Sequence, residues 1–344
     1  MTSKTEFQQH IHVFRGVAIL LIVCAHTLPS LDWSNSPLLG RALDGIANES
    51  SIFFFFIAGY LFQHLSQRFR YQEYLKQKLK TVILPYLLLS IPALVIFTFL
   101  TERTGMWSWF YGLPKWEQIG LFLLTGKHLA PLWFVPTITL FYLVAPILVR
   151  LDRSYPAFYW VIPILLVISA ILGRDGSLGP INKAVYLAPV YILGMCFSHY
   201  GEKAEQLAGK FWLPLSILTL TGYLGFLLEW SVPPHYLMIM KAPMCLLITI
   251  LLLKYHTVFG NRLDYICHVS FGIFFIHAYF ISAFNVGYKM LTEGAIYKGE
   301  GKALIEGGLF NFILFVLAVT LISVVTIWIM QRIFGKNSRM IIGA

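Results

Sequence analysis

Long apolar runs separated by short polar stretches make up most of the chain. A helix needs about 20 mostly apolar residues to cross a hydrocarbon core of roughly 30 Å. About ten runs approach that length, near residues 13–31, 50–66, 82–101, 131–150, 157–173, 184–199, 211–230, 236–256, 267–286 and 308–331. The runs lack the alternation typical of barrel strands, and backbone amides in lipid must bond within their own segment. The pattern therefore predicts an all-α polytopic membrane bundle of about ten transmembrane helices.

The predicted helices leave little room for any other domain. No internal repeat, hydrophilic domain or linker rich in Pro, Gly or Ser interrupts the runs, so we expect one transmembrane domain over residues 1–344. The first run follows Arg15 and has no small-residue cleavage site after it, which favours a retained helix over a signal peptide. Trp116–Leu124 is apolar but too short to span, which indicates an interfacial or re-entrant segment.

Composition supports the membrane class. Hydrophobic residues make up 58% of the chain and charged residues 12%, against about 25% charged in an average soluble domain. All the cysteines fall inside apolar runs, where a thiol behaves as a small hydrophobe, and no CxxC pair is present. We therefore expect no disulfide framework, no metal site and no permanently bound cofactor. The cysteines are Cys24, Cys196, Cys245 and Cys267.

Lysine and arginine are distributed unevenly between alternate loops. Of the 26 Lys and Arg residues, 16 fall on the side of the two termini, 9 fall on the other side, and Lys241 lies inside a predicted helix. The positive-inside rule places both termini in the cytoplasm. The formal net charge of +10 then reflects topology, which makes nucleic acid a poor explanation of it. The basic stretch 68–80 is dense enough to attract anionic lipid head groups or a phosphate-bearing cytoplasmic ligand.

Two polar side chains in the first helix are candidates for chemistry. Arg15 and His26 are eleven residues apart, close to three helical turns, so they share one face about 16 Å apart along the axis. Arginine offers a planar donor fork suited to phosphate, and a neutral imidazole can take a proton from a hydroxyl and pass it on. Taken singly, Arg15 could be a topology anchor and His26 a buried histidine bonded to backbone. The pair suits an anionic donor reacting with a hydroxyl acceptor.

With these residues in view, the sequence resembles the acyltransferase 3 family of bacterial membrane proteins, which acylate surface polysaccharides and related glycans. Its hallmark is an Arg or Lys and a His separated by ten residues in the first helix, matched by Arg15 and His26. The resemblance covers nearly the whole chain. Further markers follow in the family's order: the aromatic run ending in Ala58-Gly59-Tyr60, with alanine where serine is usual, the basic stretch before Pro85-Tyr86, Leu132-Trp133-Phe134, and Ser270 to His277.

The resemblance implies a donor site on the basic side of the bundle. Acyl-CoA, most simply acetyl-CoA, would be a co-substrate held by Arg15 and by point charges from Lys78 and Lys80. The family usually has arginines three apart in this stretch, where this chain has Lys78 and Thr81, so bidentate recognition is not carried over. The acceptor would be a surface glycan or a lipid-linked saccharide, in the bacterial cytoplasmic (inner) membrane.

A pocket around the thioester would be lined by Trp133, Ser270 and His277. Ser270 and His277 are about two turns apart on one helix face. His277 also suits a structural role, Trp133 also suits an interfacial position, and the phenylalanine run also suits core packing. A carboxylate could fix the tautomer of His26, and Glu49 is the first candidate for this role and Asp44 the second. Either carboxylate would also suit the start of a helix.

In the implied mechanism His26 is the general base toward the acceptor hydroxyl, or accepts the acyl group itself in a two-step route. The alternative function is a transporter or flippase, because a bundle with a few buried polar groups also describes carriers. Carriers usually have detectable repeats and broken paired helices, which this sequence lacks.

Overall fold

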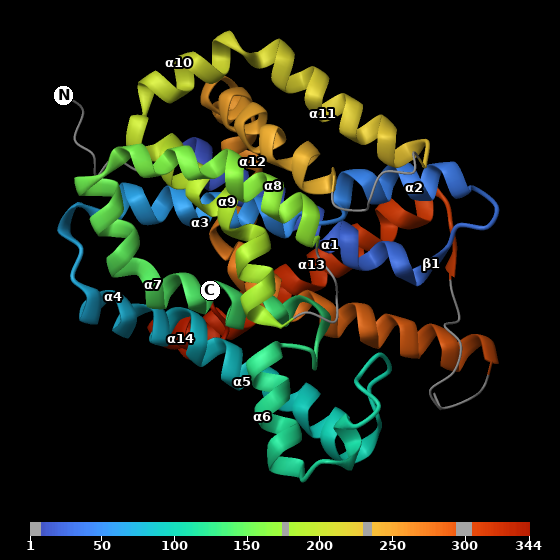
Figure 1. The fold of residues 1–344 in the computed structure, drawn as a ribbon. Helices are drawn as coiled ribbons and strands as arrows, with labels where there is room; N and C mark the ends of the chain where they lie inside the picture. Colours follow the sequence, from blue (N-terminus) through green and yellow to red (C-terminus); the bar gives the residue numbers. More distant parts are fainter. Residues whose placement is uncertain (1–7, 174–178, 230–235, 294–304) are drawn as a thin grey trace. The chain divides into compact units, whose positions relative to one another are not determined.

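The computed structural model describes residues 8–173, 179–229, 236–293 and 305–344, with the backbone alone at 236, 259–262 and 293. Nearly all of this is helix (Figure 1). The α-helices are α1 (Gln9–Thr27), α2 (Pro37–Ala47), α3 (Ser51–Leu65), α4 (Tyr71–Lys78), α5 (Leu84–Val95), α6 (Lys115–Thr125), α7 (Phe134–Ser154), α8 (Val161–Leu172), α9 (Pro180–Tyr200), α10 (Glu202–Lys210), α11 (Trp212–Leu227), α12 (Tyr236–Glu293), α13 (Leu309–Phe334) and α14 (Ser338–Ile341).

Short helices of other types and two strands complete the described chain. The 3₁₀ turns are η1 (Leu28–Ser30), η2 (Ser66–Arg68), η5 (Phe110–Gly112), η6 (Ala130–Trp133), η7 (Pro156–Trp160) and η8 (Gly335–Asn337). Two π-helices, η3 (Leu79–Ile83) and η4 (Ile96–Leu100), flank α5. The strands β1 (Leu31–Asp32) and β2 (Ile305–Glu306) pair in parallel, with Leu31 opposite Ile305.

The all-α membrane fold is confirmed, but the predicted number of crossings is too high. Within the described residues eight helical segments are long and apolar enough to span a membrane, or nine if α10 and α11, bent by 67°, form one crossing. The run at 157–173 forms η7 followed by α8, and together they cover only Pro156–Leu172, short of the about 20 residues that a crossing needs. α12 contains two of the eight segments, Leu237–Val258 and Leu263–Thr292. Of the charges used for orientation, Lys4, Arg174, Lys298 and Lys302 lie outside the described residues.

The chain divides into two compact units, each assembled from separate segments. Unit 1 contains Met1–Ile22, Gly45–Leu75 and Ile138–His268, and unit 2 contains Val23–Asp44, Lys76–Thr137 and Val269–Ala344. Because α1 belongs to both units, Arg15 falls in unit 1 and His26 in unit 2.

The centre of unit 1 is the contact between α3 and α9. A Cβ on Gly59 would lie 1.9 Å from the Tyr191 carbonyl oxygen, and one on Gly194 would lie 2.0 Å from the Phe56 carbonyl oxygen. Only glycine allows backbones to approach this closely, as is common where membrane helices pack. The phenylalanine run of α3 is buried here: the Phe56 ring lies 6.1 Å from Phe14 of α1 and 6.3 Å from Phe197 of α9. In this structure the run serves as core.

Unit 2 has a small aromatic core beside α5 and α6. Phe110 and Phe122 are fully buried, with ring centroids 4.6 Å apart, and Leu94 packs with them. The apolar stretch predicted at 116–124 is therefore the short helix α6, packed on α5. Tyr86 ties the same elements together by donating a hydrogen bond of 2.6 Å to the Leu123 carbonyl.

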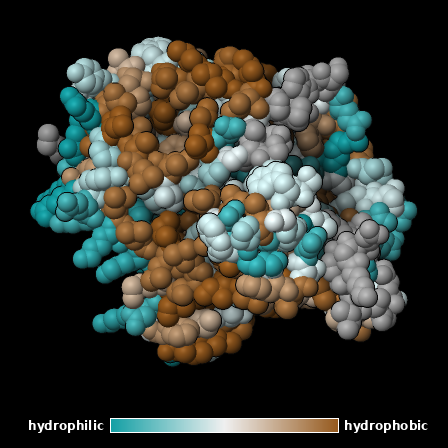
Figure 2. All heavy atoms as spheres, turned by 60° about the horizontal axis from the view of Figure 1, so that its bottom comes forward, coloured by the Kyte–Doolittle hydropathy of each residue, from teal (hydrophilic) through white to brown (hydrophobic). Residues whose placement is uncertain are grey.

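Apolar side chains also cover much of the visible surface (Figure 2). Large hydrophobic residues that are mostly exposed include Leu291, Trp160, Ile171 and Phe310. Exposed apolar surface on this scale would be unfavourable in water but is what a lipid-facing helix requires.

Candidate active site

Two histidines from distant parts of the sequence meet in unit 2. His26 lies at the end of α1 and His277 in the second half of α12, and their ring centroids are 5.3 Å apart at an interplanar angle of 42°. His26 is half-buried and His277 is completely buried. The structure thus brings together the predicted base and one predicted pocket residue.

The protonation pattern of His277 follows from its contacts. Its Nδ1 lies 2.9 Å from the Ile273 carbonyl oxygen, one turn earlier in α12. A carbonyl only accepts, so Nδ1 carries the hydrogen and donates it. In the neutral ring Nε2 then carries a lone pair, and this buried atom has no hydrogen-bond partner within the described residues. A buried acceptor without a partner is costly, which draws attention to what could bind there.

Aromatic rings connect this histidine pair to the predicted pocket. The ring centroid of Phe274 lies 6.4 Å from that of His277 and 5.2 Å from that of Phe134. The Phe134 centroid lies 6.4 Å from that of Trp133. Ser270 is fully buried on α12, two turns before His277. Trp133, Ser270 and His277 therefore all belong to unit 2, with an apolar wall between the tryptophan and the histidine.

The position of Trp133 depends on a glycine. Gly126 caps α6 in the left-handed region, with φ of 67°, and a Cβ there would lie 2.4 Å from the Trp133 backbone nitrogen. Trp133 ends the 3₁₀ turn η6 and is largely buried. The close backbone approach at Gly126 holds the tryptophan at the start of α7.

Arg15 lies in unit 1, among groups different from those around His26. It is half-buried on α1 and within electrostatic range of His12 and Cys267. His12 is 3.0 Å from an oxygen of Asp264. These neighbours all belong to unit 1.

The basic residues proposed for donor binding lie where one helix type changes into another. Lys78 is half-buried at the end of α4, and Lys80 is exposed in the π-helix η3. Thr81 stands at the position where the family usually has arginine. Its hydroxyl donates a hydrogen bond of 2.9 Å to the Gln77 carbonyl, one turn earlier. Short π-helical segments are frequent at functional sites.

The two acidic candidates lie on either side of the break between α2 and α3. Asp44 lies within α2, and Glu49 lies directly before the first residues of α3 with φ of 55°. Glu49 accepts a hydrogen bond of 2.5 Å from the Tyr186 hydroxyl, all within unit 1. Its proposed role toward His26 stays a prediction.

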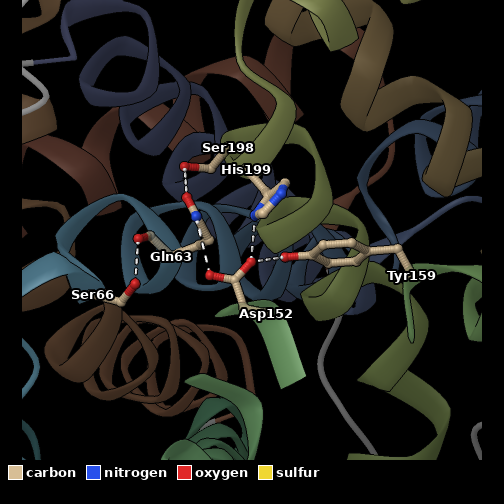
Figure 3. A network of polar contacts seen from close by, with 6 residues as sticks. All are labelled: Gln63, Ser66, Asp152, Tyr159, Ser198 and His199. Carbon is tan, nitrogen blue, oxygen red and sulfur yellow. Dashed lines mark hydrogen bonds and ion pairs between the residues drawn. The ribbon is translucent and has the colours of Figure 1, made fainter. Parts of the chain in front are cut away.

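A network at the ends of three helices escaped sequence reasoning (Figure 3). Asp152 of α7 is 4% exposed and accepts hydrogen bonds from Tyr159 at 2.6 Å, His199 at 2.6 Å and Gln63 at 3.3 Å. Ser198 extends the network by donating a hydrogen bond of 2.7 Å to the side-chain oxygen of Gln63. A buried carboxylate with several donors joins α3, α7 and α9 within unit 1. In the sequence Asp152 stands between two arginines and reads as a loop charge, so only its burial reveals it.

His128, in the loop between α6 and η6, was also missed. It is fully buried, with Nδ1 3.0 Å from the Phe122 carbonyl and Nε2 2.7 Å from Ser90 Oγ. Burial lowers the pKa of His128 from 6.5 to about 4, and the nearby positive charge of Arg103 adds to this effect. Arg103 donates a hydrogen bond of 2.9 Å to the His128 carbonyl. The contacts favour a structural role for the neutral ring.

Lys241 is a fully buried cation in unit 1. Its ammonium donates to the Ile46 carbonyl and lies 5.2 Å from the centre of the Phe53 ring. Within the described residues, no group of three or more His, Cys, Asp or Glu is arranged to hold a metal ion.

The fold is that of an all-α integral membrane protein, and two histidines, His26 and the buried His277, are in contact within it. The chain matches the family model described as an acyltransferase domain over residues 9–332. It therefore belongs to the acyltransferase 3 family and is a membrane acyltransferase. No curated protein and no solved structure gave a match.

Proposed function

We propose that this protein is an O-acyltransferase of the bacterial cytoplasmic membrane. It takes an acyl group, most simply acetyl, from cytoplasmic acyl-CoA and transfers it to a hydroxyl of a glycan or lipid-linked saccharide. The observation that carries the proposal is the contact between His26 and His277, with ring centroids 5.3 Å apart, in a chain of this family. Family membership favours this enzyme over the alternative of a transporter or flippase.

The proposed chemistry is a direct transfer between two substrates. His26 takes the proton of the acceptor hydroxyl as its oxygen attacks the thioester carbonyl carbon. The tetrahedral intermediate collapses with cleavage of the C–S bond, and the protonated imidazole returns the proton to the leaving thiolate. An ester and a free thiol are formed, and the histidine ends in its starting state.

The donor is assigned to the basic end of α1. Arg15 belongs to the same continuous helix as His26, and the guanidinium fork suits a phosphate group. Lys78, at the end of α4, and Lys80, in η3, belong to unit 2 and are the other basic residues proposed for donor binding. The acyl chain would lie against apolar groups such as Phe274 and Trp133.

The test uses purified protein in liposomes with acetyl-CoA labelled in the acetyl group, and membranes from the native cells as the source of acceptor. Wild-type protein is expected to place label in saccharide as an alkali-labile ester. His26→Ala should lower this transfer at least about 100-fold, since a lost general base costs that much or more. His268→Ala, which changes an exposed histidine of α12, is the control.

His26→Ala should keep its helical content and monodisperse elution in detergent, because it removes a polar group from a bundle. A purified variant that retained a tenth of normal turnover would disprove the role of His26. Mass spectrometry of rapidly quenched enzyme separates the two routes, since only the two-step route leaves acetyl on His26.

A further inference from the structure

The Nε2 atom of His277 is a buried acceptor whose ligand must come from outside the described chain. Nδ1 donates to Ile273 within the same helix, so the ring orientation and tautomer are set before any substrate arrives. Nε2 is left without a partner and can only accept from a donor. A satisfied buried acceptor is worth roughly 1–3 kcal/mol more than an orphaned one.

The surroundings of Nε2 favour a neutral hydroxyl as that donor. The centroid of the His277 ring lies 6.4 Å from that of Phe274 and 5.3 Å from that of His26. Ser270, two turns earlier in the same helix, is fully buried. An apolar aromatic wall is a poor site for a cationic ligand but suits the ring of a sugar. The acceptor substrate is rich in hydroxyls.

One hydroxyl cannot serve both histidines, because it has a single hydrogen to donate. The attacking hydroxyl is assigned to His26, so His277 requires another donor. Adjacent carbon atoms of a sugar carry neighbouring hydroxyls, and two rings with centroids 5.3 Å apart can each accept from one member of such a pair.

We propose that His277 Nε2 binds the hydroxyl next to the one that is acylated, so that the enzyme selects a vicinal diol. This inference rests on the proposed acyltransferase function and adds the class of acceptor to it. His277 is a positioning residue in this scheme: it holds the acceptor ring so that the reacting hydroxyl faces His26.

The experiment compares two small acceptors that differ by one hydroxyl, trans-1,2-cyclohexanediol and cyclohexanol, with labelled acetyl-CoA. Wild-type protein should acetylate the diol with a kcat/KM at least about tenfold higher, the effect of one hydrogen bond to a buried acceptor. In His277→Phe, which keeps a planar ring without the acceptor, the diol advantage should fall to about twofold, the statistical factor for two equivalent hydroxyls. The cyclohexanol rate in the same variant is the reference, so the ratio of the two kcat/KM values reports the lost hydrogen bond separately from any general loss of activity.

Two variants separate positioning from a general loss of structure. His277→Gln, whose amide oxygen can accept in place of Nε2, should recover part of the diol preference. His256→Phe is the matched control: its Nδ1 is likewise 3.0 Å from the carbonyl four residues earlier in α12, but it lies in unit 1, and the preference should be unchanged.

Equal loss of both acceptor rates in His277→Phe, a diol preference that survives the substitution, or a wild-type protein that shows no diol preference would each overturn the proposal. Label in the native saccharide together with no diol preference would refute this inference alone. Absence of acetyl transfer to any alcohol or saccharide would refute the proposed function as well.

Discussion

Arg15 and His26 share one helix and have different surroundings, which predicts different kinetic effects when each is changed. His26 contacts another imidazole in unit 2, whereas Arg15 lies near His12 and Cys267 in unit 1. The two proposed roles differ accordingly: His26 reacts with the acceptor, and Arg15 binds the charged donor.

Arg15→Lys tests the second role. Lysine retains the charge but loses the planar fork, so we expect the KM for acyl-CoA to rise about tenfold and the KM for the acceptor to change little. Steady-state kinetics with each substrate varied in turn measures both constants. Arg332→Lys, an exposed position on α13, serves as control. Equal increases in the two constants would contradict donor binding by Arg15.

His128 predicts a dependence of stability on pH. Its pKa is about 4 in the folded protein and 6.5 in an unfolded chain, so between these values the unfolded state binds more protons. Stability should therefore fall as the pH decreases from 6.5 to 4, by up to about 3 kcal/mol from this group. Thermal unfolding in detergent at pH 7.5, 5.5 and 4.5 measures the effect.

His128→Gln removes the titrating ring and should flatten this part of the pH profile, at the cost of lower stability at pH 7.5. His268→Gln, at an exposed histidine, should leave the slope as in the wild type. Parallel wild-type and His128→Gln profiles would show that burial of this ring does not control the acid sensitivity.

At the scale of elements, α3 and α9 are held at a distance that only glycine permits. The family-like aromatic run ends in Ala58-Gly59-Tyr60, and Gly59 meets the backbone of α9 while Gly194 meets the backbone of α3. The polar network of Asp152 joins the ends of the same two helices to α7. The close contact and the polar network therefore link α3 to α9 at separate places in unit 1.

Gly194→Ala should therefore destabilise the protein by about 1–3 kcal/mol, because its methyl group would meet the Phe56 carbonyl at 2.0 Å and overpack the contact. The thermal midpoint in detergent measures this loss. Gly209→Ala, in α10 with nothing within 4 Å of the new methyl group, should be neutral or slightly stabilising. A midpoint for Gly194→Ala equal to that for Gly209→Ala would show that α3 and α9 are not closely packed.

At the scale of the whole molecule, the proposed function requires the N-terminal half of α1, which carries Arg15, to face the compartment that contains acyl-CoA. An even number of crossings returns the chain to its starting side, so the bend between α10 and α11 matters for the position of the C-terminus. The excess of 16 over 9 basic residues predicts a cytoplasmic N-terminus.

Single cysteines in a background without the native four test this orientation. Gln72→Cys, exposed in α4, should resist an impermeant maleimide in intact spheroplasts and react after the membrane is opened. Ser34→Cys, exposed in the loop before α2, should react at once. The reverse labelling would place Arg15 on the side without acyl-CoA and remove the basis for a cytoplasmic donor.

The sequence by itself determined the features that depend on local physics. Apolar length and helical period are local properties, so they predicted the all-α membrane class and the shared helix of Arg15 and His26. They overestimated the crossings because an apolar run such as 157–173 has nearly the length of a crossing, and its helical segment Pro156–Leu172 remains slightly too short for one.

Only the tertiary structure decided which polar groups meet. His26 with His277, Glu49 with Tyr186, and Asp152 with His199 join segments far apart in the chain. Each pair depends on which faces of two helices pack together, and several faces of an apolar helix satisfy lipid equally well. The unpaired state of His277 Nε2 is likewise a tertiary property. Whether this atom is buried, and whether any donor reaches it, depends on the helices that pack around it.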